Sequence, residues 1–348
     1  MTMIGKAVQA ASSLDTEETL ERPGKCVVSA SKIQSGSAEQ GCSLTQITIL
    51  TVTFNRARLL PRAYESLQEQ TYESFEWIVV DDGSTDETRA LLAEKTRSAA
   101  FPVRYLWQPH TGKHVGINRG VREARGELCV ILDSDDRLVP GALERIRYWW
   151  ETIPIQERSS FAGVVGLYAD RTGKLLGSGL PQNVLDTTTI ELRTRYRVRG
   201  DTLHAYRTDV LRQYPFPENL GSFVTEALVW NRIARGYRVR CVNEVWGEVD
   251  YQPDGLSARS TLLRVKSPHA ARLYYKEFTE IPDMGISVVR RVREYANFAR
   301  FSLHAGVPWT QQLQEVQSRV LWALGAPIGA GVFLRDRLRL ARAGGQER

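Results

Sequence analysis

Apolar runs and amphipathic segments alternate along the chain from about residue 46 onward. Four short, mainly apolar runs predict strands: 47–52, 76–80, 103–107 and 128–132; the first is nearly continuous, as is typical of a strand covered on both faces. Segments with helical spacing of apolar residues follow the first three runs: 59–70, a segment from about 85 to 95, and 116–124. This alternation favours a mainly parallel sheet flanked by helices. We therefore predict an α/β fold for this part of the chain.

Further elements follow, and the pattern then becomes helical. We expect these elements to be helices at 140–152 and 223–236, strands at 161–168 and 237–244, and a strand running into a helix over 203–212. From residue 261 the sequence is basic and helical in pattern. We divide the chain into a polar leader at 1–43, a domain at 44–260 and a basic helical region at 261–348. The leader has no sustained period, so we expect it to be disordered.

Polar residues follow three of the four predicted strands at the point where each strand ends. Thr53 and Asn55 follow the first strand, Asp81 and Asp82 follow the second, and residues 133–136 follow the fourth. Ligands of open α/β sheets bind outside the carboxyl ends of the strands. We therefore expect these three loops to converge at one edge and to form the functional site.

The sequence VILDSDDR at 130–137 places three carboxylates, Asp133, Asp135 and Asp136, at the exit of a buried strand. Like charges this close raise one another's pKa unless a cation lies between them. Oxygen ligands suit Mg²⁺ or Mn²⁺, and Mg²⁺ usually binds one or two carboxylates together with substrate phosphates. The alternative is a turn whose Asp residues cap the helix that starts near Pro140.

Composition narrows the class of protein. The 348 residues carry a net charge of +6, which favours anionic partners such as phosphates, a membrane surface or nucleic acid. The four cysteines are scattered without a CxxC pair, as expected for a reducing cytosol. No secretory signal pattern is present, and no apolar run reaches the about 20 residues of a membrane-spanning helix. We expect a cytoplasmic protein.

An uncharged run at 320–334 lies between Arg319 and the arginines at 335, 337, 339 and 342. It is too short to span a bilayer and contains Gly and Pro. Segment 319–342 is suited to an interfacial helix or hairpin on an anionic bilayer, at the inner face of the cytoplasmic membrane. The alternative is a helix that packs on the domain and exposes a basic face.

Several motifs occur in an order and spacing that together are specific: ITILTVTFNR, VVDDGSTD, NRGVREARGE, VILDSDD and FVTEALVWNRIARGY. Over about residues 47–257 they resemble glycosyltransferase family 2, whose domain has the GT-A fold. The resemblance implies a nucleotide-sugar half at 44–138 and an acceptor half at 139–260. It also implies an enzyme of the hexosyltransferase type that uses a nucleotide-sugar donor.

The resemblance implies roles for residues of the donor half. Asp82 reads the nucleotide base, typically uracil, and Thr53 contacts the same nucleoside, with Asn55 in the same turn. Asp133 holds the ribose or a metal-bound water. Lys113, in the loop after the third strand, suits a phosphate contact; the alternative is a solvated surface lysine.

The acidic cluster also resembles the DxD motif of the family. Asp135, with Asp136 and Asp133, would bind a divalent cation, Mn²⁺ or Mg²⁺. When bound, this ion stabilises the charge that develops on the leaving nucleoside diphosphate.

Glu226 is the general base that the resemblance implies. In inverting transfer it deprotonates the acceptor hydroxyl on the face opposite the phosphate. The family often has an acidic pair here, whereas this chain has Glu226-Ala227, so Glu226 is the candidate of the pair. The alternative is a glutamate at a helix N-terminus that the helix dipole favours.

We therefore expect an inverting, metal-dependent glycosyltransferase that moves one sugar from a UDP-sugar to a saccharide or lipid-linked acceptor of surface polysaccharide synthesis. Neither QxxRW nor several membrane spans are present, which disfavours processive synthesis. A sugar-phosphate nucleotidyltransferase is one alternative, but the turn at 53–56 lacks the glycines of a phosphate loop. A non-catalytic nucleotide-sugar-binding module is another. Nucleic-acid binding is disfavoured, because no aromatic-interleaved basic signature is present.

Overall fold

The computed structural model describes residues 47–250, 252, 256–282 and 284–344. These residues lie in one compact unit, Leu44–Arg348. The predicted leader at 1–43 lies outside the described residues.

The first half of the domain is a parallel sheet with its helices in alternation. Its strands are β1 (Ile47–Thr53), β2 (Phe75–Asp81), β3 (Val103–Trp107) and β4 (Leu128–Ile131). Its helices are α1 (Leu60–Gln68), α2 (Thr88–Ser98) and α3 (Lys113–Glu123). β1 pairs in parallel with β2 on one side and with β4 on the other, and β3 pairs with β2. All four predicted strands are therefore confirmed.

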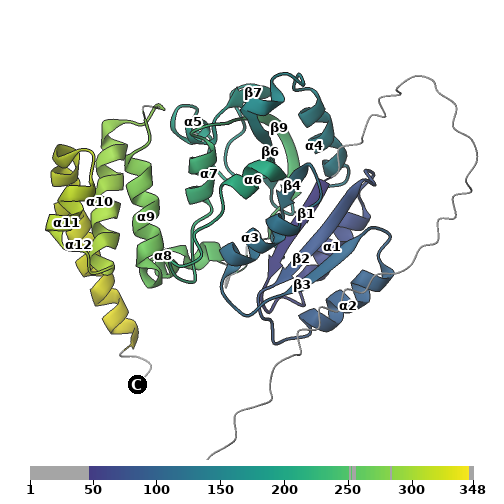
Figure 1. The fold of residues 1–348 in the computed structure, drawn as a ribbon, viewed down its shortest axis with the longest axis horizontal. Helices are drawn as coiled ribbons and strands as arrows, with labels where there is room; N and C mark the ends of the chain where they lie inside the picture. The colour runs from purple at the N-terminus through teal and green to yellow at the C-terminus, as the bar shows by residue number, and fades with distance from the viewer. Residues whose placement is uncertain (1–46, 251, 253–255, 283, 345–348) are drawn as a thin grey trace, which may run out of the picture. The chain divides into compact units, whose positions relative to one another are not determined.

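The second half extends the same sheet with mixed pairing. Its strands are β5 (Arg137–Leu138), β6 (Phe161–Ala169), β7 (Val184–Thr187), β8 (Thr202–Arg207) and β9 (Arg238–Glu248). β8 joins β4 antiparallel, and the complete order is β3-β2-β1-β4-β8-β6-β9-β5, with β7 on β9. The predicted class, a mainly parallel mixed sheet flanked by helices, is confirmed (Figure 1).

The remaining helices cover this sheet and continue beyond it. Those of the domain are α4 (Ala142–Glu151), the 3₁₀ turn η1 (Arg158–Ser160), α5 (Thr189–Thr194), α6 (Thr208–Gln213) and α7 (Ala227–Ile233). The C-terminal helices are α8 (Leu256–Lys266), α9 (Pro268–Thr279), α10 (Val288–His304), α11 (Trp309–Glu315) and α12 (Arg319–Gly344). The expected boundary between 260 and 261 therefore falls inside α8.

The core lies on both faces of the sheet, as the apolar strands require. Alternate side chains of β1 point to opposite faces: Ile47 and Ile49 join a cluster with α1 and α4, whereas Leu50 joins one with α3. All three are fully buried. Burial of each such side chain stabilises the fold by about 1.5–3 kcal/mol. This double coverage explains the continuous apolar runs.

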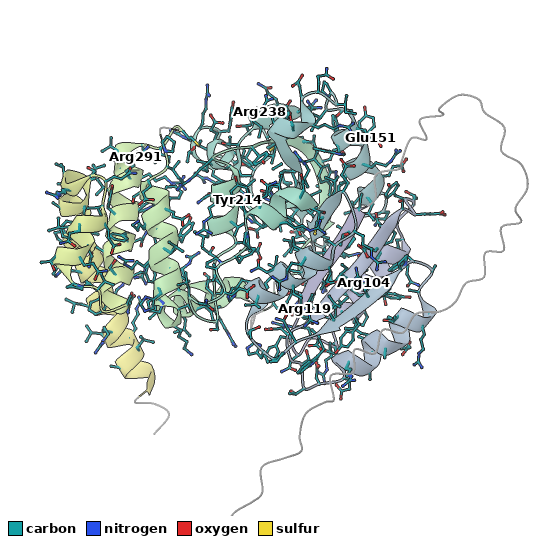
Figure 2. All side chains as sticks on the ribbon, in the orientation of Figure 1. Arg104, Arg119, Glu151, Tyr214, Arg238 and Arg291 are labelled. Carbon is teal, nitrogen blue, oxygen red and sulfur yellow. The ribbon has the colours of Figure 1, made fainter. Side chains whose placement is uncertain are left out.

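Two arginines, labelled in Figure 2, tie β3 to α3. Arg104 donates from Nη1 to the Glu123 carbonyl at 2.7 Å and from Nη2 to its carboxylate at 2.7 Å. Arg119 donates from Nη1 to the Trp107 carbonyl at 2.5 Å. These contacts fix α3, whose first residue is Lys113, against the sheet.

Segment 319–342 lies in one long helix, α12, so the hairpin alternative is wrong. Pro327 lies inside this helix, where its ring removes one backbone hydrogen bond. Glycines at 325 and 329 allow close contact with the backbone of α10. Among the described residues, no helix is both long enough and apolar enough to cross a bilayer.

Candidate active site

The loops after β1 and β2 are joined by hydrogen bonds at the carboxyl edge of the sheet. The Asn55 backbone, with a φ of 52°, donates to Ser84 Oγ at 2.9 Å. Its side-chain Oδ1 accepts from the Thr85 backbone at 2.8 Å, and the Ala57 N–H donates to Asp86 Oδ2 at 3.1 Å. Asparagine tolerates the left-handed conformation better than most residues. Asn55 therefore holds two loops of the site together.

Asp82, 2% exposed, anchors the loop after β3. Its Oδ1 accepts from Gln108 Nε2 at 2.8 Å and from the Thr111 N–H at 3.0 Å. Its Oδ2 accepts from the Gly112 N–H at 2.9 Å and lies 2.8 Å from His110 Nδ1. Gly112 has a φ of 111°, a conformation that favours glycine. Asp82 thus shapes loop 108–112, a role that the sequence did not suggest.

Beside Asp82 lies a buried hydroxyl. Thr53 is 2% exposed, and its Oγ1 makes no hydrogen bond within the described part of the protein. Phe54, 40% exposed, stacks on His110 with ring centroids 4.0 Å apart and planes 18° apart. The hydroxyl is buried, whereas the ring pair is exposed at this edge of the sheet and offers a flat face for stacking. The sequence reading missed Phe54 and His110, although an aromatic residue in a polar turn is a usable signal.

The acidic turn lies after β4, where it was expected. The Asp136 N–H donates to the Asp133 carbonyl at 3.1 Å. Burial raises the pKa of Asp136 to about 8, with Asp133 and Asp135 adding to the shift. Burial, and then Asp133, also raises the pKa of Asp135. The turn therefore concentrates negative charge that a cation would relieve.

These oxygen donors fit a divalent cation by their chemistry, but they do not form a complete cage. Across the described ranges, no three acidic, histidine or cysteine side chains are gathered as a ready-made metal site. Mg²⁺ usually takes one or two protein carboxylates and completes its shell with water and substrate phosphates. The turn at 133–136 matches such a partial ligand set.

Lys113 connects the acidic turn to the second half of the domain. Its Nζ lies 2.5 Å from Asp133 Oδ1 and 2.7 Å from Glu226 Oε1. Burial alone would lower the pKa of Lys113, but the two carboxylates outweigh burial and raise it, so the amine stays charged. The solvated-lysine alternative is therefore wrong, because Lys113 forms a bridge between two predicted site residues.

Glu226 lies immediately before α7, which is shorter than the predicted helix at 223–236. It has a φ of −59° and a ψ of −32°, and its side chain makes no capping hydrogen bond with the described helix. Its carboxylate instead reaches Lys113, and 36% of that side chain is exposed. Glu226 thus lies at the helix N-terminus, where the helix dipole favours a carboxylate, and it also forms an ion pair with another predicted site residue.

An aromatic cluster supports α7 from the sheet side. Trp230 lies 5.9 Å from the His204 ring, 4.9 Å from Tyr206 and 6.0 Å from Phe216. His204 Nδ1 hydrogen-bonds the Tyr206 hydroxyl at 2.9 Å. Burial, and then Arg193, lowers the pKa of His204 to about 3, so it is neutral at physiological pH. The sequence reading did not single out His204.

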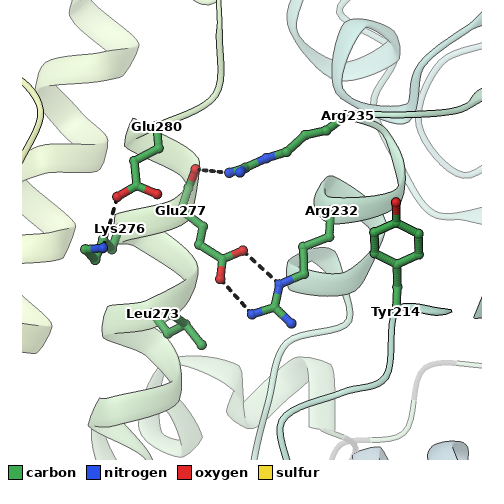
Figure 3. A pocket seen from close by; sticks show the side chains of 7 residues that line it. All are labelled: Tyr214, Arg232, Arg235, Leu273, Lys276, Glu277 and Glu280. Carbon is green, nitrogen blue, oxygen red and sulfur yellow. Dashed lines mark hydrogen bonds and ion pairs between the residues drawn. The ribbon is translucent and has the colours of Figure 1, made fainter.

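A cavity of about 430 Å³ lies between α7 and α9 (Figure 3). Arg232 of α7 donates to both carboxylate oxygens of Glu277 at 2.9 and 2.6 Å, and Arg235 donates to the Glu277 carbonyl at 2.7 Å. Lys276 lies 3.0 Å from Glu280. The charged side chains that line the cavity are paired with one another. Their ion pairs and hydrogen bonds hold α9, and with it the C-terminal helices, against α7.

Solved structures share this fold. One is TarS 1–349 of S. aureus in complex with UDP-GlcNAc, with a TM-score of 0.57 and 18% identity, covering 84% of this chain and 92% of TarS. Another is the mannosyltransferase PcManGT from Pyrobaculum calidifontis in complex with GDP-Man and Mn²⁺, with a TM-score of 0.52 and 18% identity, covering 84% and 81%. The sheet and its acidic edge place the chain in the class of GT-A folds.

Sequence comparisons match part of the chain to a known family. Residues 48–174 match the model described as glycosyl transferase family 2. The GalNAc(5)-diNAcBac-PP-undecaprenol beta-1,3-glucosyltransferase of Campylobacter jejuni is 33% identical over 193 residues, 54% of this chain and 59% of that protein. An uncharacterized glycosyltransferase of Nostoc is 35% identical over 101 residues, 29% of this chain and 31% of that protein. Residues 48–174 therefore match a glycosyltransferase family 2 domain, and the matched segments span under two thirds of either relative.

Proposed function

We propose that the protein is an inverting glycosyltransferase that moves one sugar from a nucleotide-sugar to a saccharide or lipid-linked acceptor. The observation that carries this proposal is the Lys113 bridge, 2.5 Å from Asp133 and 2.7 Å from Glu226. It joins the acidic turn of the donor half, 44–138, to a carboxylate of the acceptor half, 139–260. Donor and acceptor chemistry can therefore meet at one point.

On the donor side, the proposed nucleoside contacts are Thr53, Asn55 and Asp82, and the donor is a UDP-sugar. The exposed Phe54, stacked on His110 beside these residues, supports this assignment. Asp133 and Lys113 lie next to the position proposed for the diphosphate. Displacement of Lys113 Nζ from Glu226 toward the phosphates would free the base when donor binds.

The proposed metal ligands are Asp135, Asp136 and Asp133, with Mn²⁺ or Mg²⁺ as the ion. When bound, the ion supplies Lewis-acid stabilisation of the leaving diphosphate. Three carboxylates gathered in one turn support a cation here, because a bound cation would favour the ionised form of Asp136, whose pKa burial and its two acidic neighbours raise. The fold neighbour PcManGT was solved with Mn²⁺.

Glu226 is the proposed general base on the acceptor side. Its Oε1 takes the proton of the acceptor hydroxyl as that oxygen attacks the anomeric carbon. The bond between the anomeric carbon and the phosphate oxygen breaks, and the nucleoside diphosphate leaves with the electron pair. Attack from the opposite face inverts the anomeric configuration.

The acceptor and the location are proposed from the relatives and the charge. The Campylobacter jejuni relative is named for an undecaprenol-linked substrate, which supports a lipid-linked acceptor in surface polysaccharide synthesis. Such an acceptor would be met at the inner face of the cytoplasmic membrane. Segment 319–342, with its apolar run between arginines, is the proposed contact with anionic lipid.

Replacement of Glu226 by Gln tests the proposed function. We expect Glu226→Gln to lower kcat for sugar transfer by about 10²–10⁴-fold, because the base is lost, and to leave donor binding intact. Transfer is measured with a panel of UDP-sugars and lipid-linked or saccharide acceptors. Glu94→Gln on α2, where the glutamate side chain is 63% exposed, is the matched control.

Wild-type turnover in Glu226→Gln would refute the assignment of the base. The products separate the alternatives: a transferase releases UDP, a nucleotidyltransferase releases or consumes pyrophosphate, and a binding module turns over neither.

A further inference from the structure

An apolar stripe runs along the exposed side of α12. Its five large side chains, each 57–71% exposed, are Val320, Leu324, Ile328, Leu334 and Leu338. At about 100° of rotation per residue, these positions fall within about 120° of one another on the helix surface. Contiguous exposed apolar surface of this kind marks an interaction site.

The exposed charges of this helix are all positive. Its single acidic residue, Asp336, is 7% exposed and lies 2.6 Å from Arg300 Nε and 3.1 Å from His304 Nε2 of α10. The arginines of α12 at 319, 335, 337 and 339 are exposed, and none forms an ion pair within the described part of the chain. The outer surface of α12 is therefore apolar and cationic, without an exposed acid.

An apolar cleft of about 300 Å³ opens beside this stripe, between α11 and α12. Six residues, none of them charged, line it: Trp309, Trp322, Ala323, Ala326, Pro327 and Ala330. Ala323 and Pro327 are exposed on the same side of α12 as the stripe, so the cleft and the stripe share an edge.

The walls of the cleft are fixed by hydrogen bonds behind it. Gln312, fully buried, donates from Nε2 to the Val307 carbonyl at 2.9 Å and accepts from Trp322 Nε1 at 3.3 Å. The Trp309 and Trp322 rings meet edge to face at 5.5 Å, and Trp309 is 38% exposed. The cleft is thus an open, pre-formed apolar hollow with an indole at its rim.

We propose that α12 docks on the surface of an anionic bilayer and that the cleft binds one hydrocarbon chain of a lipid. The arginines match lipid phosphates, the stripe matches the acyl boundary, and the exposed indole of Trp309 is of a type enriched at membrane interfaces. A second copy of the chain is a poorer occupant, because the two cationic helices would repel each other. This inference rests on the proposed function, since it gives the lipid-linked acceptor a place of delivery.

Vesicle sedimentation with the full-length chain tests the docking surface. We expect binding to phosphatidylglycerol-containing vesicles that falls steeply with salt, and weak binding to pure phosphatidylcholine. The double variant Leu324→Glu with Ile328→Glu should reduce partitioning by about tenfold or more. Ile155→Glu, at an isoleucine that is 79% exposed on the sheet domain, is the matched control and should bind like wild type.

Bromine-labelled acyl chains test the cleft. Bromines near the middle of the chain should quench tryptophan fluorescence in wild type, and Trp309→Phe should remove part of that quenching. Ala323→Leu, which fills the rim at an exposed position, should reduce quenching about twofold or more while vesicle binding persists, since only the cleft is blocked. Equal quenching in wild type and Ala323→Leu would overturn the assignment of the cleft.

Two further readouts separate this inference from the proposed function. Hydrolysis of UDP-sugar without vesicles should be equal in wild type and the α12 variants. Two outcomes would overturn the docking proposal alone. In the first, every α12 variant binds vesicles as well as wild type does. In the second, wild type binds no vesicles but forms a dimer that the double variant Leu324→Glu with Ile328→Glu dissociates. Vesicle binding without any donor turnover would instead refute the transferase.

Discussion

Lys113 connects the two halves of the domain by an ion pair to each. Its amine lies between Asp133 and Glu226, two carboxylates that would otherwise face each other without compensation. A charged amine within hydrogen-bonding distance of both stabilises their ionised forms and fixes their separation. The site is therefore organised by one cation before any substrate binds.

Removal of that cation should disrupt the site more than the fold. We expect Lys113→Met to lower kcat/KM for the donor by about 10²-fold or more, because Asp133 and Glu226 then repel each other and the proposed phosphate contact is removed. Steady-state kinetics of donor turnover gives this ratio. Lys95→Met, which removes an amine paired with Glu94 on α2, should leave it unchanged. Unaltered kinetics in Lys113→Met would show that the bridge has no part in turnover.

His204 gives the fold a specific sensitivity to acid. Its pKa is about 3 in the folded protein and about 6.5 when unfolded, so between these values the unfolded chain binds the extra proton. The stability contribution is complete above pH 6.5 and is lost progressively as the pH falls toward 3. We expect the free energy of unfolding to fall by up to about 1.4 kcal/mol per pH unit from this residue.

Urea unfolding at a series of pH values measures that slope. His204→Gln keeps a polar side chain but cannot titrate, so its stability should depend less on pH between 6 and 4 than that of wild type. His269→Gln on α9 is the control for a histidine outside the cluster. Identical slopes in wild type and His204→Gln would contradict a buried, neutral His204.

At the scale of elements, α12 depends on two glycines for its packing on α10. A Cβ at Gly329 would lie 2.2 Å from the Ala296 carbonyl oxygen, and one at Gly325 would lie 2.7 Å from the Val292 carbonyl oxygen. Only the absence of side chains allows the two helix backbones to approach this closely. The core of the C-terminal helices, including Phe298, depends on this approach.

Alanine substitutions along α12 should therefore differ in sign. Gly329→Ala should lower the free energy of unfolding by about 1–3 kcal/mol, because the Ala296 backbone must move. Gly331→Ala, where a Cβ meets nothing within 4 Å, should raise it by about 0.5–1 kcal/mol through helix propensity. Denaturant midpoints of the two variants check the pair. Equal effects at 329 and 331 would show that α12 does not pack on α10 as described.

Much of the element pattern was readable from the sequence because the strands are covered on both faces. The runs at 47–52 and 76–80 lie within β1 and β2, because burial on both faces favours apolar residues, and the buried polar pair Thr48–Glu76 is satisfied by a 2.8 Å hydrogen bond. In contrast, β5 has two residues and is defined only by its pairing with β9, which no local pattern reveals. The helix predicted at 223–236 was too long, because α7 begins after Glu226.

At the scale of the whole molecule, the site was partly predictable from the topology. Parallel strands bring Thr53, Asp82 and Asp133 to one edge by rule. The Lys113–Glu226 contact was not predictable, because it joins an early helix to a late one through tertiary packing. Likewise, the role of Asp82 in anchoring loop 108–112 depends on the path of that loop, which sequence patterns do not determine.

The final prediction concerns the ligands that complete this edge. UDP with Mn²⁺ should stabilise the protein by about 2.7 kcal/mol at a concentration 100-fold above Kd, which corresponds to a Tm rise of about 4 °C for a chain of this size. A thermal-shift panel of UDP, GDP, dTDP and CMP, each with and without Mn²⁺, measures this, with Asp135→Asn as the site variant. The variant should lose the Mn²⁺-dependent part of the shift, because one carboxylate ligand becomes an amide. If UDP raises Tm equally with and without Mn²⁺, in both wild type and Asp135→Asn, the metal site is refuted and the nucleotide site is retained. A larger Tm shift with GDP than with UDP would indicate a GDP-sugar donor. The absence of a Tm shift with any nucleotide would refute a nucleotide-sugar site at this edge of the sheet.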